Sequence, residues 1–311
     1  MQMSLSRRRA IQVIACVAAL PPLAALAGEG ENALRWDGVA LGASCSITIS
    51  GGDRVQSEIA LDAARAEVER MEALFSLYRQ DSALMRLNRT GRLDNPGPDM
   101  VRLLALCGDV YRLTAGRFDP TIQPVWRLLA ESDGKPDRRS LDAARALVGW
   151  RRVAWDNRAI TYGRPGMAMT LNGIAQGYAT DRVAGVLRAR GCTSVLADIG
   201  EIAAIGEAAP GRPWRIGIAE RSDEVPEQES DLAAGMSIAT SSPHGTLLDG
   251  QGRIGHIVDP AGEGAPQPWR RVSVIHPSAA LADGLSTAFC LMDRANIEVV
   301  ASAAGAKVLL A

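Results

Sequence analysis

One segment, residues 177–205, constrains the fold more than any other part of the chain. From Gly177 to Arg190 the apolar residues recur at helical spacing, basic residues close the stretch, and Gly191 stops it. Residues 193–205 are rich in β-forming residues and are broken near Gly200, which predicts two successive strands. The chain therefore combines a strong helix with a strand pair that follows it directly.

The other predicted elements follow one another irregularly. Helices are expected over residues 57–77, 99–114, 140–147 and 283–292, and strands over residues 41–50, 214–219, 236–240, 272–276 and 306–310. Residues 207–212 and 221–231 are expected to be surface loops. Irregular connections of this kind favour an α+β (mixed α/β) fold over a regular parallel sheet. With 47% hydrophobic residues, the chain can bury a real core, and we expect one globular domain over residues 28–311.

The N-terminus predicts export. Three arginines follow Ser6, and an apolar run from Val13 to Leu26 leads into the small residues around Ala27. A basic region, a short apolar run and a small-residue cleavage site are typical of a secretory signal, and paired arginines favour the twin-arginine type. A membrane anchor is the alternative, but the run is interrupted by Pro21-Pro22 and is shorter than the about 20 residues that span a bilayer. We expect residues 1–27 to be a twin-arginine signal peptide and the mature protein to be periplasmic.

Charge and cysteine content exclude several classes of protein. Removal of the three arginines in residues 1–27 lowers the formal net charge from −1 to −4, which leaves no basic surface for nucleic acid. After the apolar run, no segment has the length and apolarity of a transmembrane helix. The remaining cysteines have neither a CxxC pair nor zinc-like spacing, so buried thiols are expected. These cysteines are Cys45, Cys107, Cys192 and Cys290.

The familiar catalytic motifs are absent. The sequence has no G-x-S-x-G elbow, no H-E-x-x-H zinc helix and no G-x-x-x-x-G-K phosphate loop. It also has no G-x-G-x-x-G that opens a strand-to-helix unit. Its only histidines, His244, His256 and His276, are too few for a multi-histidine metal centre. Any chemistry must come from short polar and glycine-containing clusters at the ends of predicted elements.

The first cluster contains Asp283 and Thr287, four residues apart at the start of a predicted helix. This spacing places a carboxylate and a hydroxyl on one helical face. Hard oxygen donors of this kind suit Mg²⁺ or Ca²⁺. The alternative is that Asp283 only caps the helix N-terminus.

Two further clusters could bind a ligand or move a proton. His256 lies before an Asp259-Pro260 turn, and histidine is the side chain best able to shuttle protons near neutral pH. A structural role for this lone histidine is the alternative. Gly173 and Gly177 lie just before the strongest helix, whose free N–H groups favour phosphate. Taken alone, this segment is an ordinary loop leading into a helix.

The order of the clusters is more specific than any one of them. The motifs, in chain order, are Phe75-Ser-x-Tyr-Arg, Gly116-x-Phe-Asp-Pro-Thr, Gly173-Ile-Ala-x-Gly-Tyr-Ala-x-Asp181-Arg182, Pro213-Trp-x-Ile-Gly-Ile, Ala239-Thr-Ser, His256-Ile-x-Asp-Pro and Ala282-Asp-x-Leu-Ser-Thr-Ala. Together they resemble the ApbE family of FAD:protein FMN transferases, from about Leu41 onward. Within that family, the export signal and the segments at 170–178 and 197–202 look like the NosX accessory proteins of nitrous-oxide reductase systems.

The resemblance implies a reaction and its site. Family members bind FAD and Mg²⁺ and transfer FMN to a threonine or serine of an acceptor flavoprotein. For this chain, the acceptor would be a membrane protein with a periplasmic-facing flavin domain. The resemblance places the metal on Asp283, Thr287 and the main-chain carbonyl of Gly173, with His256 and Asp283 as catalytic residues. The implied flavin-contacting residues are Leu41, Tyr78, Arg117, Phe118, Asp119, Thr170, Gln176 and His256.

Three positions depart from the family pattern. The family usually has Asp at the position of Thr170, Lys at that of Gln176, and two glycines where this chain has Gly200 alone before Glu201. The first two changes keep open a periplasmic FAD-binding carrier without transferase activity. A metal-dependent FAD pyrophosphatase, which would use water in place of an acceptor, is a third hypothesis. A generic solute-binding module would leave the ordered motifs unexplained.

Overall fold

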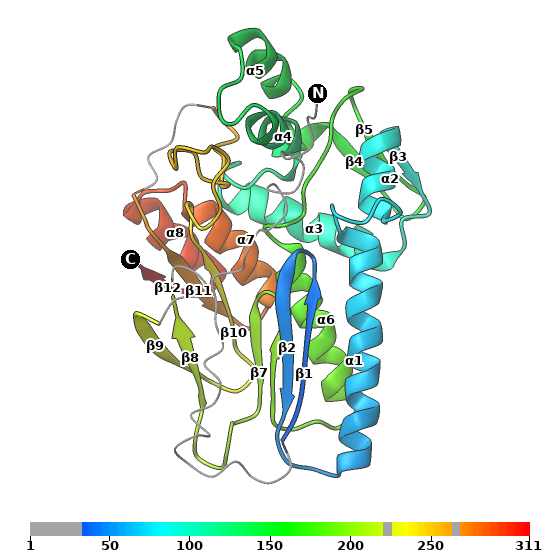
Figure 1. Cartoon of the computed structure of the whole chain (residues 1–311), viewed down its shortest axis with the longest axis vertical. Helices are drawn as coiled ribbons and strands as arrows, with labels where there is room; N and C mark the ends of the chain where they lie inside the picture. Colours follow the sequence, from blue (N-terminus) through cyan, green and yellow to red (C-terminus); the bar gives the residue numbers. More distant parts are fainter. Residues whose placement is uncertain (1–32, 220–225, 263–267) are drawn as a thin grey trace, which may run out of the picture.

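A seven-stranded antiparallel sheet organises the structure, a computed structural model that describes residues 33–219, 226–262 and 268–311 (Figure 1). Its strands, in spatial order, are β1 (Leu34–Ala40), β2 (Ala43–Ile49), β6 (Val195–Asp198), β7 (Ile202–Ile205), β10 (Ser237–Ser241), β11 (Val272–His276) and β12 (Lys307–Leu310). The strand pair expected on either side of Gly200 is confirmed as β6 and β7. The signal peptide predicted over residues 1–27 lies outside the described residues.

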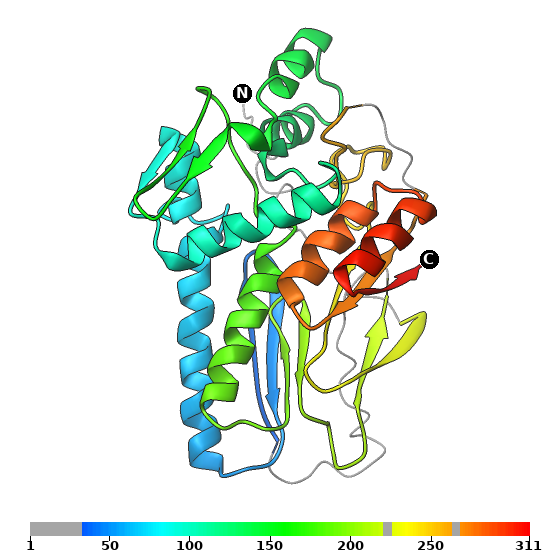
Figure 2. The ribbon, with the colours of Figure 1, turned by 180° about the vertical axis from the view of Figure 1, so that it is seen from behind.

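Four helices cover one face of this sheet, as Figure 2 shows. They are α1 (Arg54–Phe75), α6 (Ala175–Ala189), α7 (Ala279–Phe289) and α8 (Arg294–Ala304). The apolar stripe of α6 explains its central place, because Ala179, Val183 and Leu187 are completely buried. On the opposite face, the hairpin of β8 (Trp214–Ile218) and β9 (Gln228–Leu232) buries a second, smaller apolar cluster.

Smaller elements gather at one end of the molecule, at the top of Figure 1. Here α3 (Pro98–Leu113) packs on α7, and a three-stranded sheet has the order β3-β5-β4. The other elements are α2 (Ala83–Thr90), β3 (Arg92–Asp94), the 3₁₀ turn η2 (Pro120–Ile122), α4 (Gln123–Glu131), α5 (Arg138–Arg145), η3 (Trp150–Arg152), β4 (Val153–Trp155) and β5 (Ala159–Tyr162). Mixed α and β structure is confirmed as the fold class.

Two sequence expectations need correction. The helix expected to begin at Asp283 begins at Ala279, because the side chain of Ser278 caps it by accepting from the backbone N–H of Leu281. Asp283 therefore lies in the second turn of α7 and does not cap that helix. The loop expected over residues 221–231 includes β9 from residue 228, while residues 220–225 lie outside the described part of the chain.

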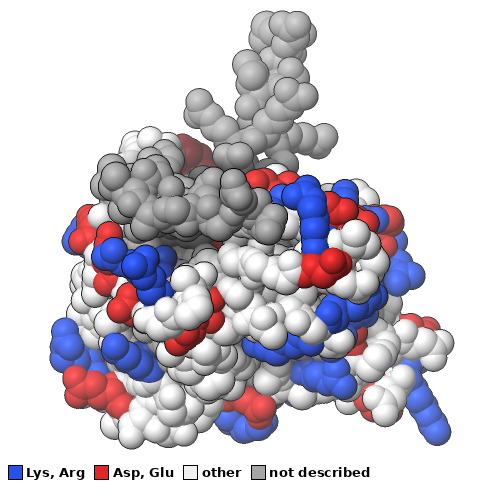
Figure 3. Space-filling view, turned by 90° about the horizontal axis from the view of Figure 1, so that it is seen from below, with Lys and Arg blue, Asp and Glu red and all other residues white. Residues whose placement is uncertain are grey.

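The cysteines and the surface agree with the sequence. The four cysteines within the described residues are free thiols; Cys45, Cys107 and Cys290 are buried, and Cys192 is half-buried. On the face shown in Figure 3, basic and acidic side chains alternate, in line with a formal net charge of −1. Among the described helices, none has the length and apolarity to cross a membrane.

Candidate functional site

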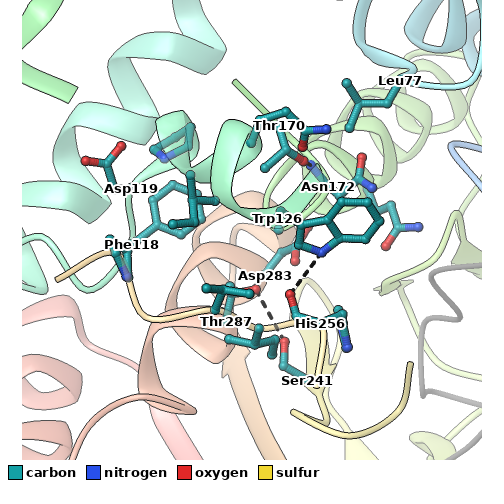
Figure 4. Close-up of a pocket in the computed structure, with 18 of the residues that line it drawn as sticks. Leu77, Phe118, Asp119, Trp126, Thr170, Asn172, Ser241, His256, Asp283 and Thr287 are labelled. Carbon is teal, nitrogen blue, oxygen red and sulfur yellow. Dashed lines mark hydrogen bonds between the residues drawn. The ribbon is translucent and has the colours of Figure 1, made fainter. Parts of the chain in front are cut away.

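A cavity of about 460 Å³ lies where α7 and the sheet meet the smaller elements (Figure 4). One side, which we call the polar wall, is formed by Glu201, Thr240, Ser241, Ser242, Asp283 and Thr287. The other side, the apolar wall, is formed by Phe118, Ile122, Trp126, Ile257, Val258 and Pro260. The two walls offer a ligand oxygen donors on one side and aromatic and aliphatic surface on the other.

Helix α7 places two side chains of the polar wall. Asp283 and Thr287 lie one turn apart and both line the cavity, as their spacing predicted. The Oδ2 atom of Asp283 accepts a 3.0 Å hydrogen bond from the backbone N–H of Gly177 in α6. The hydroxyl of Ser241 lies 3.4 Å from that of Thr287 and 2.8 Å from that of Ser286.

Gly173 completes the group of residues expected at the metal. A Cβ atom at Gly173 would lie only 2.9 Å from Thr287 Oγ1, so the backbone there packs directly on the threonine side chain and leaves no room for a side chain. The structure thus brings Gly173, Asp283 and Thr287 to one end of the cavity. Within the described residues, no group of three or more His, Cys, Asp or Glu side chains could hold a metal. A carboxylate, a hydroxyl and a nearby carbonyl form a set that suits a hard cation such as Mg²⁺.

The charges of the polar wall also fit a cation. Burial raises the pKa of Asp283 to about 8 in the protein without metal. Burial, and then the charges of Asp283 and Asp198, raise the pKa of Glu201 well above its usual value. Glu201 is 2% exposed and receives one hydrogen bond, of 3.2 Å, from the backbone N–H of Thr240. A divalent cation bound near Asp283 and Glu201 would offset the free-energy cost of ionising these two buried carboxyl groups.

The apolar wall depends on side-chain contacts between distant segments. The indole N–H of Trp126 donates to the main-chain oxygen of His256 at 3.1 Å, which holds α4 against the loop at residues 255–262. Arg117 forms a 3.1 Å ion pair with Asp259 of the same loop. Phe118, next to Arg117 in the chain, is buried and lines the cavity.

Asp119 lines the cavity but is engaged by its own surroundings. One carboxylate oxygen accepts from the N–H and hydroxyl of Thr121, at 2.8 and 2.6 Å. The other oxygen accepts from the backbone N–H of Trp150 at 3.1 Å. These bonds fix the turn that presents Phe118.

His256 is half-buried in the cavity wall, and its backbone N–H donates to Thr246 O at 3.0 Å. Its ring nitrogen Nδ1 lies 3.3 Å from the same oxygen. Desolvation lowers the pKa of the imidazole to about 4. The side chain is therefore neutral at pH 7 and serves as a hydrogen-bonding group rather than as a charge.

Of the other residues implied in flavin contact, Tyr78, Thr170 and Gln176 line the cavity, whereas Leu41 does not. Tyr78 and Thr170 are joined through Asn172, whose side-chain amide donates to the Tyr78 hydroxyl at 3.2 Å. The backbone N–H of Asn172 donates to Thr170 Oγ1 at 3.2 Å. Leu41 lies beside this group in the β1–β2 turn, where φ is 50°, and it receives a 3.5 Å contact from Gln176 Nε2 at its main-chain oxygen.

Gln176 and Gly200 form a local pair. The Gln176 side chain is 3% exposed, and a Cβ atom at Gly200 would lie 2.7 Å from its Cδ atom. Gly200 also has a φ of 96°, which favours glycine. The single glycine before Glu201 is therefore matched to the neutral side chain that packs on it.

The sequence did not single out Trp126 or Ser242, and it gave no site role to Glu201 or to Ser241, which appeared only within the Ala239-Thr-Ser motif. The signal for the serines was the run of hydroxyl residues at the end of a predicted strand. Ser242 is 1% exposed, and its hydroxyl has no hydrogen-bond partner among the described residues. A buried hydroxyl without a partner in a cavity wall suggests a bound ligand that supplies one.

Comparisons of sequence and of structure with known proteins both find similarity to one family. Residues 41–310 match the model of the ApbE family. A relative from Vibrio cholerae serotype O1, called FAD:protein FMN transferase, is 31% identical over 256 residues, which cover 78% of this chain and 76% of the relative. A relative from Klebsiella pneumoniae (strain 342) with the same name is 27% identical over 283 residues, covering 86% and 80%.

Solved structures extend the likeness to the fold. The flavin transferase ApbE from Vibrio cholerae has a TM-score of 0.78 and 25% identity, with 89% of this chain and 93% of that chain covered. The flavinyl transferase ApbE from Pseudomonas stutzeri, in its apo form, has a TM-score of 0.75 and 27% identity, with 89% and 92% covered.

Proposed function

Because the chain belongs to the ApbE family and is, like its named relatives, a transferase, we propose that it moves FMN from FAD onto a threonine or serine of a partner protein and releases AMP. The observation that carries this proposal is the cavity with two unlike walls. The polar wall suits a diphosphate with its cation, and the apolar wall suits an aromatic ring system.

Three neighbouring residues are the ones that would hold Mg²⁺. These are the Asp283 carboxylate, the Thr287 hydroxyl and the main-chain carbonyl of Gly173, which meet in one corner of the cavity. When bound, Mg²⁺ would neutralise the negative charge that builds on the departing AMP phosphate. Glu201 adds a second buried carboxylate to this corner and strengthens its attraction for a cation.

The reaction requires one bond to form and one to break. The acceptor hydroxyl oxygen attacks the FMN phosphorus, a phosphoester bond forms, and the phosphoanhydride bond to AMP breaks with its electron pair on AMP. The hydroxyl proton would pass to water or to a phosphate oxygen of the departing AMP. The low pKa of His256 makes it a weak base, so we assign it the orientation of the flavin, held by its contacts to Trp126 and Thr246. Positioning and charge neutralisation would provide most of the catalysis.

The partner and compartment are proposed from the sequence. The arginines after Ser6 support twin-arginine export to the periplasm. The segments at residues 170–178 and 197–202 look like those of NosX accessory proteins. On this basis we propose an acceptor flavoprotein in the membrane, with its flavin domain facing the periplasm, in a nitrous-oxide respiration system.

A second function, FAD binding without transfer, is favoured by one specific feature. Thr170 and Gln176 are neutral where the family pattern usually has a carboxylate and an ammonium, and Gln176 is buried against Gly200. A carrier of this kind would keep FAD intact in the presence of an acceptor.

One experiment separates these functions. The mature protein is incubated with FAD, Mg²⁺ and the periplasmic domain of a candidate acceptor, and the acceptor is weighed by intact mass spectrometry. A mass gain of one FMN group that EDTA prevents would support transfer and the metal assignment together. Retained FAD without a gain favours the carrier, and release of FMN and AMP without an acceptor favours a pyrophosphatase.

A further inference from the structure

Helices α6 and α7 each contribute a carboxylate that accepts hydrogen bonds from backbone N–H groups at the start of the other helix. Asp181 belongs to α6, yet its oxygens accept from the first residues of α7. Asp283 belongs to α7, and its Oδ2 accepts from the backbone N–H of Gly177 in the first turn of α6. Each helix thus satisfies free N–H groups of the other, which a helix start cannot satisfy internally.

Asp181 holds the start of α7 with three hydrogen bonds. Its Oδ1 accepts from the backbone N–H of Ala279 at 2.8 Å. Its Oδ2 accepts from the backbone N–H of Ala280 at 3.1 Å and from the Ser278 hydroxyl at 2.8 Å. The carboxylate is therefore placed as a second cap for α7, beside the cap that Ser278 provides.

The two helices also touch through their backbones. A Cβ atom at Gly177 would lie 2.2 Å from the main-chain oxygen of Ala279, so only glycine permits this approach. The contact and the two carboxylates fix both the distance between the helices and the rotation of α7. With Oδ2 bound to Gly177, the other oxygen of Asp283 is left for the cavity.

We propose that Asp181 is a positioning residue for the metal site. Its hydrogen bonds to the start of α7 set the direction in which Asp283 and Thr287 face the cavity. The proposal rests on the metal assignment made under the proposed function. Asp181 does not line the cavity. It acts on the metal residues through its hydrogen bonds to the start of α7, and its negative charge also lies near Asp283. Residues that orient metal ligands typically change metal affinity by about 10- to 100-fold when they are replaced.

The test compares Mn²⁺ binding in two variants, followed by electron paramagnetic resonance of the free ion. Asp181→Asn keeps the side-chain volume but replaces one accepting oxygen with a donor that faces other donors. Asp293→Asn is the matched control, since Asp293 caps the neighbouring helix α8 by accepting from the backbone N–H of Asn296 at 2.9 Å. We expect Asp181→Asn to weaken Mn²⁺ binding about tenfold and Asp293→Asn to leave it unchanged.

A double variant separates positioning from simple capping. Asp181→Ala with Ser278→Asp restores a capping carboxylate to α7 but no longer ties α7 to α6. We expect its melting temperature in EDTA to recover relative to Asp181→Ala alone, while Mn²⁺ affinity stays low. Recovery of both quantities would show a capping role only and would overturn the proposal.

The two proposals fail in different ways. If the parent protein binds no more Mn²⁺ than an Asp283→Asn variant, the metal assignment itself is wrong and this inference falls with it. If the parent binds Mn²⁺ and Asp181→Asn binds it within twofold of the parent, only the positioning role is wrong. The double variant decides the same question should Asp181→Asn not fold.

Discussion

The two walls of the cavity are built in different ways. The polar wall comes from β10, α7 and the residue before β7, which are parts of the central sheet and the helix layer on it. Asp283 and Glu201 are each 2% exposed. The apolar wall comes from a 3₁₀ turn, α4 and a loop, which belong to the smaller elements at one end of the molecule.

Some of the connections that hold the apolar wall lie nearer the surface. Arg117 is 33% exposed where it pairs with Asp259, and an exposed arginine, Arg145, donates to Gly262 O at 3.3 Å. Catalysis needs fixed geometry, so we expect the polar wall, which belongs to the core, to hold the reacting groups. We expect the apolar wall, which is built largely from loops, to recognise the flavin, because loops often carry binding residues.

The largest effect should come from the polar wall. Asp283→Asn removes the only charged side chain assigned to the metal, and we expect FMN transfer to fall by about 10³-fold or more. The fold should persist, because burial already raises the pKa of Asp283 and the neutral form is tolerated without metal. The rate of acceptor mass gain and the melting temperature in EDTA measure the two quantities. Asp142→Asn, on the exposed α5, is the charge-matched control. A fully active Asp283→Asn enzyme would overturn the metal assignment.

The apolar wall should change binding more than chemistry. Trp126→Ala removes the indole that lines the cavity and its hydrogen bond to His256 O. We expect FAD affinity to fall about 30-fold with a small change in kcat, because an aromatic contact and one hydrogen bond are each worth about 1 kcal/mol. Flavin fluorescence titration gives the affinity, and Trp126→Phe should recover the part due to the ring. If kcat fell as far as in Asp283→Asn, the division between the walls would be wrong.

The sequence predicted the polar wall better than the apolar wall, and the reason is the range of the interactions. Asp283 and Thr287 are four residues apart in one helix, so their convergence follows from helix geometry alone. Trp126 and His256 are 130 residues apart and meet only after the chain has folded. No periodicity reports such a contact, and the ordered motifs marked His256 without its partner.

The elements that the sequence did not predict include both short and longer ones. Strands β3 and β4 have three residues each, which is too few for an alternating pattern to show. Strand β1 has seven residues, but Asp37 and Gly38, which are poor β-formers, interrupt it. Helix α4, with nine residues, was also not predicted. The start of α7 was placed four residues late because Gly284 follows Asp283 and weakened the helical signal there. Ser278, a good N-cap residue, was the feature that marked the true start.

The next prediction concerns the pH dependence of stability that a neutral His256 causes. Its folded-state pKa of about 4 lies below the ordinary value. His256 therefore binds a proton below about pH 6.5 in the unfolded chain, but only below about pH 4 in the folded protein. As the pH falls through that range, protonation of His256 stabilises the unfolded chain and lowers the free energy of unfolding. Between pH 7 and pH 4.5, the parent should lose about 2 kcal/mol more unfolding free energy than His256→Asn, since each pKa unit is worth about 1.4 kcal/mol. Urea unfolding at both pH values measures this, and an equal loss in the two proteins would contradict a neutral His256.

The smallest effect concerns Ser242, where the polar wall ends. Its hydroxyl is buried without a partner among the described residues, and such a group costs about 1 kcal/mol in the free protein. If bound FAD supplies the missing partner, Ser242→Ala should raise the stability of the free protein and also raise the Kd for FAD, by about three- to fivefold. Ser273→Ala is the control, because Ser273 already shares a 2.8 Å hydrogen bond with Thr240 and its loss should lower stability. Higher stability together with weaker FAD binding would show that Ser242 contacts FAD. Higher stability with unchanged FAD affinity would show that, in the polar wall, FAD does not reach Ser242 and contacts only the residues near the metal.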